Sequence, residues 1–174
     1  MFKKYDVILN KEQFYQEAER VLNNVGIFFE QHQLLSQIRF DHIGFKCASA
    51  EEFESMRKMF ESGSSYIFQS IISNRRIAII KLSDSIQTTL GFISVLELSD
   101  QKPDQSQKSG FDHLEVYPIE GSVEKLVECI QEKGIDIHQE VKPHHTTWDF
   151  FVDTFKVRIE PGALIEKIKE EEMV

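Results

Sequence analysis

Two histidines and two glutamates recur in this chain at matching places. The tetrapeptide Phe40-Asp41-His42-Ile43 returns 71 residues later as Phe111-Asp112-His113-Leu114. Each copy opens a run whose pattern predicts strand, helix, strand, strand and strand, and each run closes on a strand that ends in a glutamate, Glu97 or Glu160. The His-to-Glu separation is 55 residues in the first copy and 47 in the second, a difference that loops can absorb.

This duplication predicts a metal site. If the two modules fold alike and associate about a pseudo-twofold axis, His42, Glu97, His113 and Glu160 come to equivalent places around one point. Two imidazoles and two carboxylates form a mixed nitrogen and oxygen set that suits a divalent ion such as Ni, Zn, Fe, Co or Mn. Two coordination positions would stay open for water or substrate.

Each of these residues, taken singly, also has an ordinary structural explanation. A lone histidine on a strand is usually a core residue, and a lone glutamate before a turn is usually solvated. The duplication favours the metal site, because two unrelated core histidines would not share both a local motif and a distal glutamate.

The rest of the chain divides around the two copies. Asn10, with Gln13 three residues later, is a good N-cap for a helix over residues 10–33, inside an N-terminal addition of residues 10–35 that lies outside the repeat. The first βαβββ module spans 38–99 and the second 110–162, with a polar linker at 99–110. Residues 163–174 form a C-terminal helix that frays into a tail. We expect one α+β domain over residues 1–174.

Regular strand alternation predicts which residues share a face of the sheet. In the first copy an apolar set, Ile43, Phe45 and Cys47, opposes a mixed set, Phe40, His42, Gly44 and Lys46. In the second copy Leu114 and Val116 oppose Phe111, His113, Glu115 and Tyr117.

Composition excludes several classes of partner. Twenty Lys and Arg against 29 Asp and Glu leave a formal net charge of −9, which argues against a nucleic-acid backbone or an anionic membrane as the main partner. No apolar run approaches the ~20 residues needed to cross a bilayer, and the N-terminus lacks an apolar signal segment, so we expect a cytoplasmic protein. Cys47 and Cys129, without a C-x-x-C spacing, are expected to be small core residues.

Several charged side chains near the expected site keep more than one interpretation. Glu115, two residues after His113, is solvated, orients a ligand, or carries a proton. Arg158 and Lys156 share the Glu160 face and either hold an anionic substrate or pair with a nearby acid. His144 and His145 form either an exposed loop pair, or a cap and alternative ligands for the site.

The motifs together resemble the vicinal-oxygen-chelate superfamily, which includes glyoxalase I, extradiol dioxygenases and bleomycin-resistance proteins. The YecM-like branch is the most similar: it shares the N-terminal helix, a D-H-I-x-x-K/R-C start matching Asp41 to Cys47, an R-x-I-x-x-x-K-L strand matching Arg75 to Leu82, and a closing hairpin before a proline. The resemblance covers roughly residues 10–168. It implies that the two βαβββ modules pack as a cup-shaped mixed sheet with a metal at its floor. Glyoxalase-like ligands would be His42, Glu97, His113 and Glu160, although the YecM-like branch places His at the position of Glu160.

Two functions then remain open. In a metalloenzyme the ion would chelate two adjacent oxygens of a small substrate and stabilise an enediolate or related anion, with Glu97, Glu160 or Glu115 moving the proton. Isomerases, lyases and dioxygenases all use such a site. In the alternative, the chain holds a metal or small ligand without turnover, as bleomycin-binding members do. The partner in either case is a small molecule, and the chain is a monomer or a homodimer.

Overall fold

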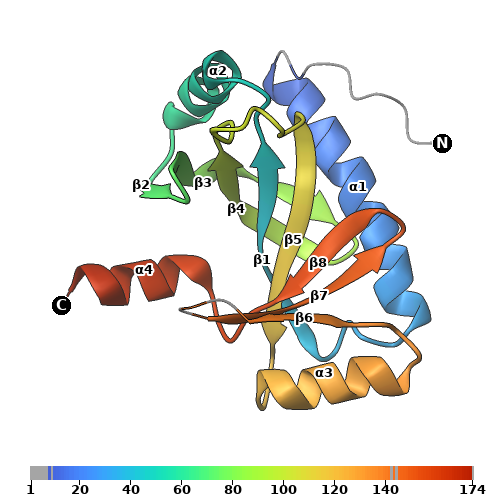
Figure 1. Cartoon of the computed structure of the whole chain (residues 1–174). Helices are drawn as coiled ribbons and strands as arrows, with labels where there is room; N and C mark the ends of the chain where they lie inside the picture. Colours follow the sequence, from blue (N-terminus) through green and yellow to red (C-terminus); the bar gives the residue numbers. More distant parts are fainter. Residues whose placement is uncertain (1–7, 9, 142, 144, 174) are drawn as a thin grey trace.

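One mixed sheet of eight strands forms the centre of the molecule (Figure 1). The computed structural model describes residues 8, 10–141, 143 and 145–173. The strands lie in the order β2-β3-β4-β1-β5-β8-β7-β6. Their bounds are β1 Ile38–Lys46, β2 Ile67–Ile72, β3 Arg75–Thr88, β4 Gly91–Ser99, β5 Gly110–Pro118, β6 His138–Val141, β7 Thr146–Val152 and β8 Phe155–Ile159.

The strand order shows the duplication directly. In each module the first strand pairs in parallel with the last, β1 with β4 and β5 with β8, and the remaining two strands extend outward as antiparallel neighbours. The two modules meet along β1 and β5, which run antiparallel at the centre. The α+β fold with two βαβββ modules and an added N-terminal helix is therefore confirmed, and the first strand of each module is the one that bears its histidine.

Three helices cover one face of the sheet. They are α1 (Lys11–Gln31), α2 (Ala50–Glu61) and α3 (Val123–Glu132), and each begins with a side chain that accepts a hydrogen bond from a backbone N–H in the first turn: Asn10, Ser49 and Ser122. Their apolar stripes join alternate strand residues in one continuous core. Cys47 lies in this core and Cys129 is half-buried.

The fourth helix, α4 (Leu164–Glu172), packs on the opposite face. Its Ile168 forms a separate small cluster with Ile77 and Ile79 of β3 and Val95 of β4, residues that alternate with the core-facing ones. We call this side of the sheet the cup face. It is apolar under α4 and polar along β1, β5 and β8.

A β-bulge precedes each histidine. The pairing of β1 with β5 shifts register between Phe40 and His42, and again between Gly44 and Phe45, opposite Asp112. Each bulge inserts one residue and reverses the alternation there. The prediction that Phe40 shares a face with His42, and Phe111 with His113, is therefore wrong. Both phenylalanines pack in the helix-covered core, with ring centroids 5.7 Å from Phe29 for Phe40 and 5.1 Å from Phe14 for Phe111.

The linker between the modules is anchored to the sheet by a buried glutamine. The Gln107 side chain donates to the carbonyl oxygens of Cys47 and Asp100, at 2.7 and 2.8 Å, and accepts from the Arg75 guanidinium at 2.5 Å. Arg76 pairs with Asp100 at 2.7 Å. Both arginines therefore hold the linker against the sheet.

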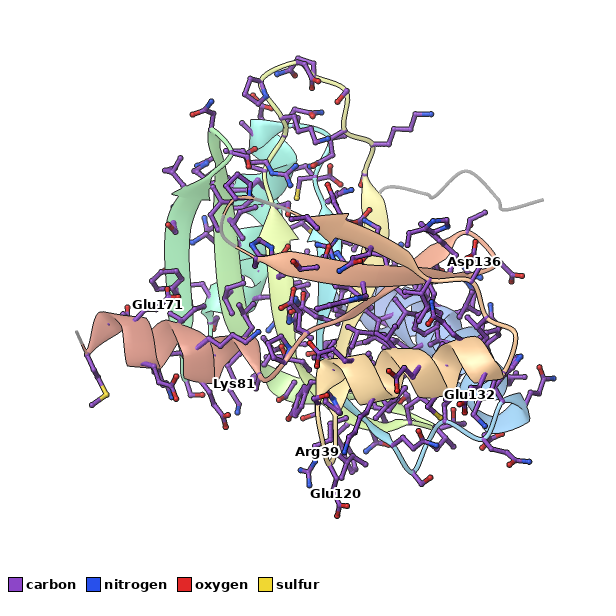
Figure 2. The ribbon with its side chains drawn as sticks, turned by 60° about the horizontal axis from the view of Figure 1, so that its bottom comes forward. Arg39, Lys81, Glu120, Glu132, Asp136 and Glu171 are labelled. Atoms are coloured by element: carbon purple, nitrogen blue, oxygen red, sulfur yellow. The ribbon has the colours of Figure 1, made fainter. Side chains whose placement is uncertain are left out.

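Many of the charged side chains lie at the surface. Arg39, Glu120, Glu132 and Glu171 are exposed and project away from the ribbon (Figure 2). The acidic residues of the cup face differ from these because they are largely buried. In the part of the chain that the structure describes, no helix is long and apolar enough to cross a membrane.

Candidate metal centre

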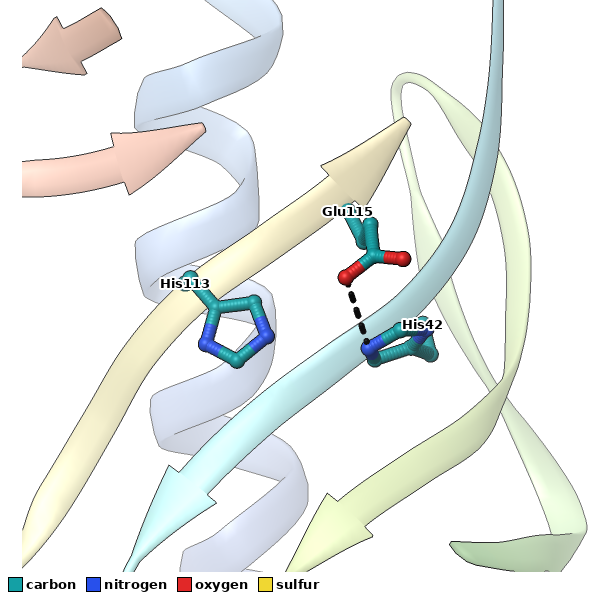
Figure 3. A group of neighbouring side chains, drawn as sticks. All are labelled: His42, His113 and Glu115. Atoms are coloured by element: carbon teal, nitrogen blue, oxygen red, sulfur yellow. Dashed lines mark ion pairs between the residues drawn. The ribbon is translucent and has the colours of Figure 1, made fainter. Parts of the chain in front are cut away.

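The two repeated histidines face each other at the junction of the modules. His42 on β1 and His113 on β5 have ring centroids 5.6 Å apart and ring planes at 84° (Figure 3). Their exposed fractions are 0% and 6%. The pseudo-twofold relation expected from the repeat therefore does bring both imidazoles to one place.

Each imidazole is held by the aspartate that precedes it. His42 Nδ1 lies 2.7 Å from Asp41 Oδ2, and His113 Nδ1 lies 3.0 Å from Asp112 Oδ2. Because these aspartates occupy the bulges, their carboxylates can reach the same side of the strand as the rings. When a ring is neutral, Nδ1 carries the proton, which leaves the lone pair of Nε2 pointing into the space between the modules.

Those two Nε2 atoms are buried and have no hydrogen-bond partner among the described residues. A buried polar atom without a partner is costly, so such an atom normally indicates a missing water, ion or ligand. Two such atoms on facing rings indicate one shared partner, which is either a metal ion that accepts their lone pairs or a group that donates hydrogen bonds to them.

Two carboxylates lie beside the orphaned nitrogens. Glu115 Oε2 is 3.4 Å from His42 Nε2 (the dashed line in Figure 3), and Glu97 Oε2 is 3.5 Å from the same atom. The other oxygen of Glu97 is 4.0 Å from His113 Nε2. Ligand bonds of about 2.0–2.2 Å place adjacent donors about 3.0–3.4 Å apart around a metal ion. One ligand atom from each of His42, His113 and Glu115 lies within 4.8 Å of the others, so the residues present fit a divalent ion.

The two copies differ at the position two residues after each histidine. In the second copy this residue is Glu115, whose carboxylate reaches towards His42. In the first copy it is Gly44, and a Cβ atom there would lie 2.3 Å from Cε1 and 2.9 Å from Nε2 of His113. Gly44 thus provides the space that the His113 ring occupies, while Glu115 supplies an acid.

Glu160 lies just beyond β8 and has another partner. Its Oε2 is 3.3 Å from Lys167 Nζ of α4, and its ligand role stays a prediction. Glu97, by contrast, sits beside both histidines. The structure therefore brings His42, Glu97 and His113 of the predicted ligands together and adds Glu115 to them.

Arg158 pairs with an acid. It makes a two-pronged contact with Asp149, both bonds 2.8 Å, and neither partner is more than one-sixth exposed. Lys156 lies 4.0 Å from Asp112. His145 is exposed, and His144 lies outside the described residues.

The close packing of acids and imidazoles shifts their pKa values. Burial lowers the pKa of His42, but Glu115, Asp41 and Glu97 outweigh burial and hold it well above its ordinary value. Burial acts to raise the pKa of Glu97, yet the adjacent His42 and His113 bring it down to about 2. Burial raises the pKa of Glu115, helped by the charges of Glu160 and Glu97. Glu115 is therefore the carboxyl group here most inclined to carry a proton.

Sequence reasoning did not identify three residues of the site: Asp41, Asp112 and Gly44. The aspartates were visible as part of the repeated tetrapeptide, which could have suggested carboxylate–histidine pairs. Gly44 carried no signal of its own, because its role depends on a ring from the neighbouring strand.

Comparison with known proteins supports this architecture. A family model described as YecM protein matches residues 4–164. A structural-genomics protein called EC4020 has a similar structure, with a TM-score of 0.69 and 17% identity over 98% of each chain. No curated protein matches the sequence.

Two enzymes are similar to this chain at lower TM-scores. Hydroxyglutarate synthase from Oryza sativa, in complex with 2-oxoadipate, has a TM-score of 0.51 and 8% identity over 100% of this chain and 90% of that chain. A variant of Streptomyces coelicolor methylmalonyl-CoA epimerase with 2-nitronate-propionyl-CoA has a TM-score of 0.49 and 16% identity over 75% and 98% of the two chains. At these identities the likeness concerns the fold alone.

Proposed function

This chain belongs to the YecM protein family, and we propose that it binds one divalent metal ion at the junction of its two modules. The observation that carries the proposal is the pair of buried Nε2 atoms of His42 and His113, which have no hydrogen-bond partner among the described residues. A metal ion accepts both lone pairs at once, and the neighbouring carboxylates balance its charge.

The ligand set that the distances favour is His42, His113, Glu97 and Glu115. Their separations of 3.4, 3.5 and 4.0 Å need only small side-chain rotations to meet one ion. Glu160 is the alternative carboxylate expected from the glyoxalase-like pattern, and it would first have to leave Lys167. The mixture of imidazole and carboxylate donors suits Ni, Zn, Fe, Co or Mn.

The chain's own residues then have distinct tasks. Asp41 and Asp112 fix the tautomer and tilt of the rings. In the metal-free site Glu115, with its raised pKa, can hold a proton, which it must release before its carboxylate binds an ion. A bound ion would act as a Lewis acid towards the oxygens of a chelated ligand.

The ligand we propose is a small molecule with two adjacent oxygens. Such a site is compatible with isomerase, lyase and dioxygenase chemistry, and also with binding without turnover. A cytoplasmic location and a monomeric or homodimeric state stay predictions from the sequence.

Metal analysis of protein purified without an affinity tag tests the proposal. The unmodified chain should carry up to one divalent ion after incubation with Zn²⁺ or Ni²⁺ and desalting. His42→Ala and His113→Ala should each lose it while keeping the circular dichroism of the unmodified protein. His138→Ala is the matched control, because His138 is exposed on β6. Metal content unchanged in both site variants would refute the proposal.

The same measurement separates the two candidate carboxylates. Glu115→Gln should weaken metal binding more than Glu160→Gln, because only Glu115 lies against a histidine. The reverse order would assign the fourth ligand to Glu160.

A turnover assay separates an enzyme from a binding protein. Metal-loaded protein should be assayed with the methylglyoxal–glutathione hemithioacetal and with catechols. Turnover that depends on the added metal identifies an enzyme, and tight binding without product identifies a binding protein.

A further inference from the structure

The start of helix α4 is capped by a residue far away in the sequence. Its N-cap residue, Ala163, offers no side-chain hydrogen bond. Instead the backbone N–H of Leu164 donates to Asp41 Oδ2 at 3.0 Å, across 123 positions of the chain. Asp41 thus satisfies one of the free N–H groups in the first turn of α4 and places a negative charge at the positive end of the helix.

The same oxygen holds His42. Asp41 Oδ2 is 2.7 Å from His42 Nδ1, so one carboxylate atom accepts both the helix N–H and the imidazole N–H. The Asp41 side chain is only 8% exposed, so little water is available to replace these donors. The position of the His42 ring is therefore coupled to whether α4 is docked.

The second module lacks this coupling. Asp112, the repeat counterpart of Asp41, is held by Lys46 at 2.5 Å and by Lys156 at 4.0 Å, both on strands of the sheet. His113 thus rests on a support within the sheet, whereas His42 rests on a support that a separate helix helps to form.

Several side-chain contacts dock α4 on the cup face. Ile168 packs with Ile77, Ile79 and Val95, and Leu164 and Ile165 lie partly buried against the same cluster. Lys167 pairs with Glu160, and Lys169 Nζ lies 5.2 Å from the ring centroid of Tyr66. The helix is short and residues 169–173 are exposed, which favours local opening of α4.

We propose that Asp41 is a positioning residue through which docking of α4 sets the metal affinity of the site. When α4 is docked, the Leu164 N–H fixes the Asp41 carboxylate, which in turn holds the His42 ring with Nε2 towards the ion. When α4 leaves, that carboxylate loses a restraint and gains solvent, and the ring loses its preferred orientation. This inference rests on the proposed metal site, but its structural part concerns the metal-free protein as well.

Replacing one backbone N–H tests the coupling. Leu164→Pro deletes the donor at the first position of a helix, where proline is well accepted, and the extended conformation of Ala163 (φ −65, ψ 135) suits a residue before proline. Leu164→Ala is the matched control, because it also removes the leucine side chain but keeps the N–H. Zn²⁺ affinity, measured by competition with a chromophoric chelator, should be about 10–100-fold weaker in the proline variant than in the alanine variant.

A second readout does not depend on metal. In metal-free protein labelled with ¹⁵N-histidine, the side-chain nitrogen shifts of His42 should move in Leu164→Pro and those of His113 should stay in place. Equal Zn²⁺ affinities together with unmoved His42 shifts in the two variants would overturn the coupling. If the unmodified chain binds no divalent ion, the proposed function fails, while the His42 shifts still decide whether α4 positions the ring.

Linkage supplies an independent check with the unmodified protein. If docking of α4 strengthens metal binding, metal binding must strengthen docking by the same factor. Hydrogen exchange in residues 164–172 should therefore slow on Zn²⁺ loading. Exchange in α4 that metal leaves unchanged would contradict the proposal.

Discussion

Gly44→Ala tests whether the site depends on the space that Gly44 leaves for His113. An added Cβ would lie 2.3 Å from Cε1, 2.5 Å from Nδ1 and 2.9 Å from Nε2 of the ring. Gly44 is paired with Glu97 of β4 on one side and with His113 of β5 on the other, so its backbone is held in the middle of the sheet. The ring, rather than the strand, has to move.

The size of the effect follows from these distances. Ordinary carbon contacts begin near 3.4 Å, so the ring must shift by roughly 1 Å. Metal–ligand distances tolerate only about 0.2 Å, and disturbing the support of a ligand already weakens metal binding about 10–100-fold. We expect at least that loss, about 1.4–2.8 kcal/mol. In metal-free protein, overpacking costs about 1–3 kcal/mol and the stiffer backbone returns about 0.5–1, which leaves a modest net destabilisation.

The assay is Zn²⁺ competition with a chromophoric chelator, with urea unfolding of the metal-free form alongside. Gly162→Ala is the control, because a Cβ there meets nothing within 4 Å and no left-handed backbone angle opposes it. The control should bind Zn²⁺ like the unmodified protein. If Gly44→Ala binds Zn²⁺ within twofold of that value, then His113 is not a ligand in the position described, and the geometry of the site has been misinterpreted.

Two further predictions concern protons and a buried ion pair. The raised pKa of His42 means that the metal must displace a proton from its ring, so apparent affinity should rise with pH up to that pKa and level off above it. Calorimetric titration at neutral pH in buffers of different ionisation enthalpy measures the release, and uptake with no proton released contradicts the assignment. Arg158→Lys keeps the charge but loses the two-pronged contact with Asp149, which should lower the free energy of unfolding by about 1–3 kcal/mol in urea. Lys81→Arg, at an exposed position, is the reference, and equal midpoints would show that this contact adds no stability.

Much of the architecture followed from local sequence features. The repeated tetrapeptide revealed the duplication, and the Asn10 cap predicted where the first helix begins. The facing pair His42 and His113 also followed, because a duplicated module that pairs with itself must bring equivalent residues together. These inferences succeed because they depend on short-range periodicity or on symmetry.

The sequence by itself thus determined the doubled βαβββ pattern and the residue types gathered at its axis. Only the tertiary structure decided their exact partners. Bulges at Asp41 and Asp112 reverse the alternation of side chains along β1 and β5, and the hydrophobic pattern of the sequence gives no sign of them. As a result Phe40 and Phe111 pack in the core, and the two aspartates lie beside Nδ1 of the histidine rings. Glu115 joins the site because it lies opposite His42 on the neighbouring strand. Glu160 forms an ion pair with Lys167 because α4 docks beside it. Such contacts join residues distant in the chain, and they are set by how strands register and helices pack, which local sequence patterns do not encode.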